Sequence, residues 1–153
     1  MYTQLKISEA KKIIKDKLDL EILSLPESER LITEYPLSIE EYKLNHPRGA
    51  LLIVYKGSDF QKSKVEGFQI QPRDLQIGII AVIKKNNGSK EPEEYVDFIK
   101  DSLTGIEIQV EREEKKTYPV KDEWLKEESG EWWYAVTIIV PTMSIEKKIL
   151  DHQ

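Results

Sequence analysis

Three stretches of sequence decide the fold: ALLIVYK at residues 50–56, LQIGIIAVI at 75–83 and WWYAVTIIV at 132–140. Each stretch is almost continuously apolar, and each is far shorter than the roughly 18 residues that indicate a membrane span. Short apolar runs of this kind predict strands that are largely buried on both faces. We therefore expect these three strands to share one sheet at the centre of the protein.

Two other segments have the spacing of amphipathic helices. At residues 8–18, apolar side chains recur at helical intervals behind Ser8, whose hydroxyl is a suitable N-cap. At residues 92–103, Pro92 suits the start of a helix, and Gly105 suits the left-handed conformation that ends one. Each helix has a single apolar stripe, so both are expected to cover the sheet.

The N-terminal third predicts two shorter elements. Residues 20–25 alternate loosely and indicate a short strand, which Pro26 would end. Ser38 and Glu41 have the spacing of a capping box, which predicts a short helix over residues 38–44.

The C-terminal half predicts further strands and turns. Residues 106–110 alternate as a half-buried strand does, and the charged run 111–116 is typical of a hairpin or loop. Turns are expected at 86–88 and at Ser129-Gly130, and a less regular segment surrounds Trp124. This order of elements favours an α+β fold, with a largely antiparallel mixed sheet and two main helices packed on one side. No linker or repeat divides residues 1–153, so a single domain is expected.

Composition excludes several classes of function. The chain has 153 residues, with 23 basic and 28 acidic side chains and a net charge of −5. That balance argues against specific nucleic-acid binding, which needs a clustered basic surface. The chain has no cysteine and only two histidines, His46 and His152. The N-terminus lacks the apolar segment of a signal peptide, so we expect a cytoplasmic protein without a membrane partner.

No motif of catalysis is present in the sequence. Phosphate-binding glycine loops, nucleophile elbows and zinc-protease helices are all absent. The acidic doublets, such as Glu40-Glu41, fall on predicted exposed faces and are interpreted as solvated surface. His46 is interpreted as a local hydrogen bonder and His152 as part of a frayed end. We therefore expect no enzyme activity, no cofactor and no metal site.

Four residues are candidates for an interface with another protein. Arg48 and Arg73 stand at the starts of the first two predicted central strands, and arginine is enriched at interfaces. Their alternative role is strand-end surface charge, with a weak ion pair between Arg73 and Asp74. Trp132 and Tyr134 flank Trp133, so the three aromatic rings must alternate between the two faces of a strand. One face is core, and the other must place a large aromatic ring against another element or a partner chain.

A set of motifs resembles a known family. The motifs are HPRGALLIVYKGS at 46–58, QPRDL at 71–75, LTG at 103–105, YPV at 118–120 and GEWWY at 130–134, followed by PT at 141–142 and IE at 145–146. In this order and spacing they resemble the Mu-like phage tail proteins, specifically the tail terminator or tail completion group. The resemblance covers residues 39–146, and it carries no catalytic motif and no family site residue.

The resemblance implies a tail-terminator-like α+β fold and a structural role. Such a protein forms a ring oligomer, for which a hexamer is one size, and the ring caps the tail tube and helps to join it to the head. The implied partners are other copies of this chain, the tail tube protein and the head–tail connector proteins. The implied location is the host cytoplasm during assembly and then the virion tail. The alternatives are a monomeric cytoplasmic module that binds a protein or small ligand, and an enzyme that uses carboxylates alone.

Overall fold

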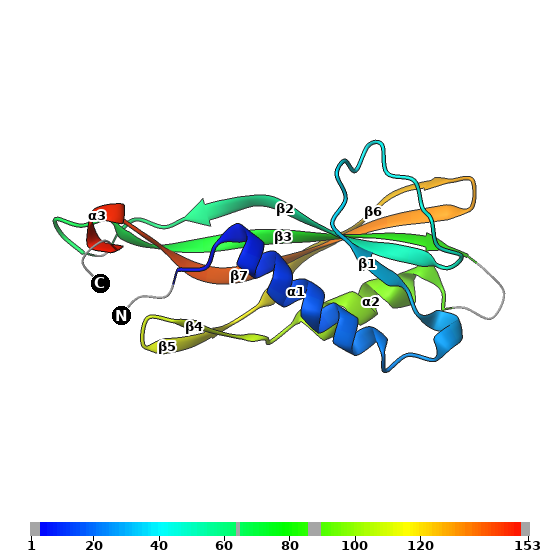
Figure 1. The fold of residues 1–153 in the computed structure, drawn as a ribbon, viewed down its shortest axis with the longest axis horizontal. Helices are drawn as coiled ribbons and strands as arrows, with labels where there is room; N and C mark the ends of the chain where they lie inside the picture. Colours follow the sequence, from blue (N-terminus) through cyan, green and yellow to red (C-terminus); the bar gives the residue numbers. More distant parts are fainter. Residues whose placement is uncertain (1–3, 64, 86–89, 151–153) are drawn as a thin grey trace.

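A five-stranded mixed sheet forms the centre of the protein (Figure 1). The computed structural model describes residues 4–63, 65–85 and 90–150. The strands lie in the order β1-β2-β3-β7-β6, in which β1 is parallel to β2 and every other neighbouring pair is antiparallel. Their bounds are Ile32–Glu34 for β1, Gly49–Phe60 for β2, Ile70–Lys84 for β3, Tyr118–Glu128 for β6 and Glu131–Ile145 for β7. The three predicted central strands are confirmed as β2, β3 and β7, and each is longer than its apolar stretch.

Helices α1 (Ile7–Ile22) and α2 (Pro92–Leu103) cover the same face of this sheet. Their apolar stripes, including Ile14 and Ile99, are fully buried against the strands. The Tyr95 hydroxyl of α2 donates to the Glu29 carbonyl at 2.6 Å, and burial raises the pKa of Tyr95 to about 12. The α+β architecture and the placement of both helices are confirmed.

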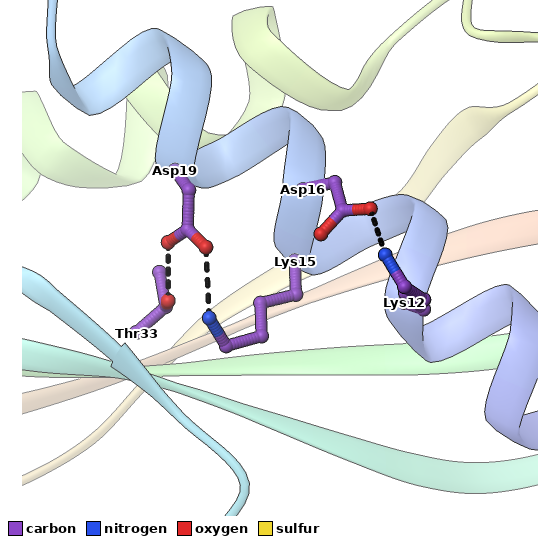
Figure 2. A network of polar contacts seen from close by, with 5 residues as sticks. All are labelled: Lys12, Lys15, Asp16, Asp19 and Thr33. Carbon is purple, nitrogen blue, oxygen red and sulfur yellow. Dashed lines mark hydrogen bonds and ion pairs between the residues drawn. The ribbon is translucent and has the colours of Figure 1, made fainter.

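A polar network attaches α1 to the short edge strand β1 (Figure 2). Asp19 accepts a hydrogen bond from the Thr33 hydroxyl of β1 and one from Lys15 Nζ at 2.8 Å. Lys12 and Asp16 form a separate exposed ion pair at 2.6 Å on the same helix. The carboxylate of Asp19 thus joins the helix to a strand that sequence periodicity does not predict.

The opposite face of the sheet is covered by residues 35–48, which we call the covering loop. A second cluster of buried side chains, among them Leu52, Val82 and Trp133, packs under Ile39, Tyr42 and Leu44 of this segment. The predicted helix at 38–44 is wrong. Ser38 Oγ accepts from the Glu41 N–H at 3.3 Å, but only one turn forms. An extended path lets the loop spread its apolar side chains over the sheet, which a short helix could not do.

Two predictions near α1 are also wrong. The expected strand at 20–25 does not form, because α1 continues to Ile22, which is buried one turn beyond Leu18. The N-cap is Lys6 rather than Ser8, and the Glu9 carboxylate accepts the Lys6 N–H at 3.0 Å. Two further short helices flank the sheet, at Glu27–Glu29 (η1) and Lys147–Leu150 (α3).

The predicted strand at 106–110 is confirmed as β4 (Glu107–Val110). It pairs with β5 (Glu113–Lys116), so the charged run forms the second half of a hairpin. The turn at Ser129-Gly130 is confirmed, because both residues have positive φ angles, 54° and 81°. The predicted turn at 86–88 and the frayed end at His152 lie outside the described residues. The single domain over 1–153 stays a prediction.

Candidate interaction surface

An arginine held by neutral hydroxyls lies near one end of β2 and β3. Arg73 Nε donates to Ser58 Oγ at 3.0 Å, and Arg73 Nη2 donates to the Tyr55 hydroxyl at 3.3 Å. The guanidinium carbon lies 5.2 Å from the centroid of the exposed Phe60 ring. We call Tyr55, Ser58, Phe60 and Arg73 the arginine patch. The patch lies on the same face of the sheet as the two helices, because Tyr55 pairs with Ile77 and Ser58 pairs with Leu75, and both of these partners belong to the helix-side core.

The arginine patch carries a positive charge that has no carboxylate partner within the described part of the chain. None of the ion pairs among the described residues includes Arg73. Tyr55 and Ser58 are joined by a hydrogen bond of 2.6 Å. That bond lowers the pKa of Tyr55, and the Arg73 charge lowers it further. The expected ion pair with Asp74 is absent from this part of the chain, because neighbouring residues in a strand point to opposite faces.

Two carboxylates face each other on the reverse side of the same strands. Asp59 of β2 pairs directly with Asp74 of β3, and Asp59 accepts a hydrogen bond from Gln76 Nε2 at 2.9 Å. Burial raises the pKa of Asp74, and the charge of Asp59 raises it further. Like charges directly opposite each other in a sheet are destabilising. The two faces of this strand end therefore differ in charge.

The edge strand β6 exposes several large apolar side chains, which are distributed over both faces of the sheet. Trp124 is 57% exposed, and Tyr118, Val120 and Leu125 are exposed beside it. The register shifts between Pro119 and Lys121 and between Trp124 and Lys126, so Val120 and Leu125 are bulged residues. Because Trp124 pairs with Tyr134 of β7, its ring points to the side of the sheet that carries α2.

The structure distributes the four predicted interface residues over two ends of the sheet. Arg48 is half-buried, and its Nε donates to the Arg30 carbonyl at 2.8 Å. Trp132 is half-buried and Tyr134 is 9% exposed, both against the helix-side core. Trp132 pairs with Ile83 at one end of β3, whereas Arg73 lies toward the other end. Arg48 therefore contacts the backbone of another segment, whereas Arg73 contacts two side-chain hydroxyls and the exposed Phe60 ring.

Trp133 resolves the alternative that the sequence left open. It points to the face opposite Trp132, where it is covered by Tyr42 of the covering loop. The second face is therefore closed by another element of the same chain. A large exposed aromatic ring lies on β6, where Trp124 is 57% exposed. The two bulges break the alternation of β6, which explains why the sequence pattern around Trp124 is less regular than in the other strands.

His46 is confirmed as a local hydrogen bonder. Its Nδ1 accepts the backbone N–H groups of Arg48 at 3.2 Å and Gly49 at 3.3 Å. Burial lowers the pKa of His46, and the charge of Arg48 lowers it further. The imidazole thereby holds the backbone in a turn immediately before β2.

Clusters of metal-ligating side chains and helices that could span a membrane are both absent from the part of the chain that the structure describes. They contain no group of three or more His, Asp or Glu side chains placed to hold a metal ion. No helix among them has the length and apolar character needed to span a bilayer.

The fold defines the class: an α+β protein built on a five-stranded mixed sheet with two helices on one face and a loop on the other. The sequence model of the Gp37 protein family matches residues 21–153. The chain belongs to this phage-associated family. No curated protein matches the chain.

Proposed function

We propose that this phage protein is a tail terminator or tail completion protein, which forms a ring that caps the tail tube and helps to join the tail to the head. Membership of the Gp37 family supports a phage role. The resemblance of residues 39–146 to Mu-like tail proteins supports the more specific assignment. The protein would act in the host cytoplasm during assembly and then remain in the virion tail.

The observation that carries the proposal is the exposed edge strand β6. Its outer backbone groups lie at the border of the sheet, and its apolar side chains include Trp124 and Leu125. Exposed edge strands invite pairing with another chain, and large exposed apolar side chains favour an interface. An exposed edge of this kind is expected in a protein that functions as an oligomer.

Symmetry explains why that assembly should be a ring. A tube end has rotational symmetry, and a cap can contact every tube subunit equally only if it has the same symmetry. Head-to-tail contacts that close by rotation give such a ring. The contacts between copies can be weak in solution, because the tube holds the copies side by side at high effective concentration.

The proposal is tested by deleting the gene from the phage that encodes it and examining the lysate by electron microscopy. We expect tails of abnormal length and heads without joined tails, and a plasmid copy of the wild-type gene should restore normal particles. Gold-labelled antibody should bind at the head-proximal end of the tail. Normal tails joined to heads in the deletion lysate would overturn the proposal and favour a monomeric binding module.

A further inference from the structure

We propose that Arg73 is the centre of a carboxylate-binding contact between copies of this chain, and that the edge strand β6 of the next copy supplies the carboxylate. This inference rests on the proposed ring and deepens it, because it names the two surfaces that meet. Each surface is present in the isolated chain.

The geometry of the arginine patch fits a carboxylate. A guanidinium has more N–H donors than the two hydroxyls of Tyr55 and Ser58 accept, so donors remain for a ligand. The two hydroxyls and the Phe60 ring hold the group in one orientation. A guanidinium held in this way binds a carboxylate through two parallel hydrogen bonds. Phe60 and Tyr55 form an exposed aromatic rim, which would exclude water from that pair.

The surroundings of the patch disfavour a polyanion such as nucleic acid. Asp59 and Asp74 lie on the same strand ends as the patch, and the chain as a whole carries a charge of −5. A repeating phosphate backbone would be repelled by these charges beyond its first contact. A single carboxylate on a protein surface needs only the guanidinium itself.

Charge complementarity selects a second copy as the occupant. Strand β6 has four carboxylates and two lysines, and α2 has four carboxylates and one lysine. Asp122 and Asp97 form no ion pair among the described residues, although both lie close enough to raise the pKa of Lys100. These two carboxylates belong to β6 and α2, the elements next to the exposed Trp124 ring. An acidic surface with an aromatic ring thus complements a basic patch with an aromatic rim.

The two surfaces lie at different positions along the sheet: Arg73 pairs with Phe60 and Thr142, whereas Asp122 pairs with Val136, which lies opposite Ile79. The arginine patch is near the end of β2 and β3 that leads into the 61–69 loop, and β6 runs toward its turn with β7 at the other end (Figure 1). A contact between two different surfaces can repeat head-to-tail from copy to copy, and this repetition closes a ring when each step adds a rotation. A two-fold dimer would also pair the patch of each copy with β6 of the other, but its assembly would stop at two chains.

The test exchanges the two charges. In one variant Arg73→Glu reverses the patch, and in a second Asp97→Lys with Asp122→Lys reverses the acidic surface. A reporter for contact is available because the chain has no cysteine. Gln61→Cys beside the patch and Leu125→Cys on β6 are introduced together, and a bismaleimide linker is added at high protein concentration.

We expect the parent chain with both cysteines to give a ladder of cross-linked oligomers. Either charge variant alone should weaken self-association roughly 30-fold, because it leaves like charges facing each other. A mixture of the two variants should restore the ladder, since each then offers the charge that the other lacks. This recovery also shows that both variants fold. The matched control for Arg73→Glu is Lys43→Glu, which changes the net charge by the same amount from an exposed position in the covering loop.

The outcomes separate this inference from the proposed function. If the parent chain forms a ladder that neither charge variant weakens, the contact between Arg73 and β6 is wrong and ring formation stands. Loss of the ladder in both variants without recovery in the mixture would also overturn the inference. If the parent chain gives no ladder and the deletion phage assembles normally, both proposals fail.

Discussion

Tyr42 lies edge-on against Trp133, with the ring centroids 6.3 Å apart and the ring planes at 76°. Through this contact the covering loop closes the face of the sheet that the helices leave open. The contact is between the two rings, since neither the Tyr42 hydroxyl nor Trp133 Nε1 forms a hydrogen bond of ordinary geometry among the described residues, although the Glu34 carboxylate lies near the hydroxyl. Burial raises the pKa of Tyr42, and the nearby Glu34 carboxylate raises it further.

This contact predicts that the ring of Tyr42 matters and its hydroxyl does not. Tyr42→Phe should leave the free energy of unfolding unchanged or raise it by about 1 kcal/mol, because a buried polar atom without a partner is removed. Tyr42→Ala should lower it by about 2–4 kcal/mol, because Trp133 loses its cover. Urea denaturation of both variants measures the difference. A large loss of stability in Tyr42→Phe would mean that the hydroxyl has a partner in solution.

The helix-side core gives a second prediction. Ile79 and Ile99 are fully buried where β3 meets α2. Ile79→Ala or Ile99→Ala should each destabilise the protein by about 2–5 kcal/mol, since each substitution removes buried methyl groups and leaves a cavity. Leu37→Ala is the control, because Leu37 is fully exposed in the covering loop. Unchanged denaturation midpoints for both isoleucine variants would contradict the placement of α2.

Two glycines should differ sharply in their tolerance of alanine. A Cβ at Gly49 would lie 2.4 Å from the Val82 carbonyl oxygen, and its φ of +146° is unfavourable for other residues. A Cβ at Gly78 would meet chiefly the flexible stem of Lys56, at 2.8 Å. Gly49→Ala should therefore cost more than about 3 kcal/mol, and Gly78→Ala about 1 kcal/mol. Thermal unfolding compares the two, and equal losses would show that the start of β2 can move.

For Gly78→Ala a specific local change is also expected. Lys56 Nζ donates to the Thr137 hydroxyl at 3.0 Å, across the position where the new methyl group would lie. The substitution should displace Lys56 and break this hydrogen bond. Lys56→Met in the Gly78→Ala background should then cost no further stability. An additional loss in the double variant would show that the bond persists.

The pair Asp59 and Asp74 predicts a pH effect with a definite sign. The pKa of Asp74 in the folded protein is above its ordinary value, so the folded state binds more protons than the unfolded state between the two values. The free energy of unfolding therefore falls as pH rises from the ordinary pKa of aspartate to the higher pKa of Asp74 in the folded protein. Above the folded pKa the loss of stability is complete. Asp74→Asn should raise stability at neutral pH and gain nothing well below the ordinary pKa of aspartate. Glu41→Gln, at an exposed site, is the control in a denaturation series over pH, and equal effects of the two substitutions would refute the pairing.

The exposed Trp124 ring on β6 predicts that its substitution affects assembly of the phage tail but not folding of the chain. Trp124→Ser should change the free energy of unfolding by less than about 1 kcal/mol, because the ring is mostly in solvent. The same substitution should abolish complementation of the deletion phage. Tyr134→Ser, one strand away, removes a buried ring and should destabilise the fold itself. Full complementation by folded Trp124→Ser protein would contradict a role for this surface.

Much of the central architecture could be predicted from local pattern. Residues 50–56, 75–83 and 132–140 are so apolar that only a buried strand suits them, and all three are central in the sheet. Helix α2 has the predicted bounds, because Pro92 and Gly105 mark its ends chemically. The interior strands and α2 are determined by the residues within them, so local sequence was sufficient here, whereas the two ends of α1 were not predicted correctly.

Other elements depend on contacts that sequence spacing does not encode. Strand β1 has three residues and is positioned by Thr33 bonding to Asp19 on α1. Residues 38–44 carry a capping signal, yet burial of Ile39, Tyr42 and Leu44 on the sheet prevails over it. The surface roles were also decided by folding: Tyr134 is buried and Trp124 exposed, because β7 is an interior strand and β6 is an edge. Composition and periodicity determined which residues must be buried, and only the tertiary structure decided which strand was left at the border of the sheet and where Arg73 found its hydroxyl partners.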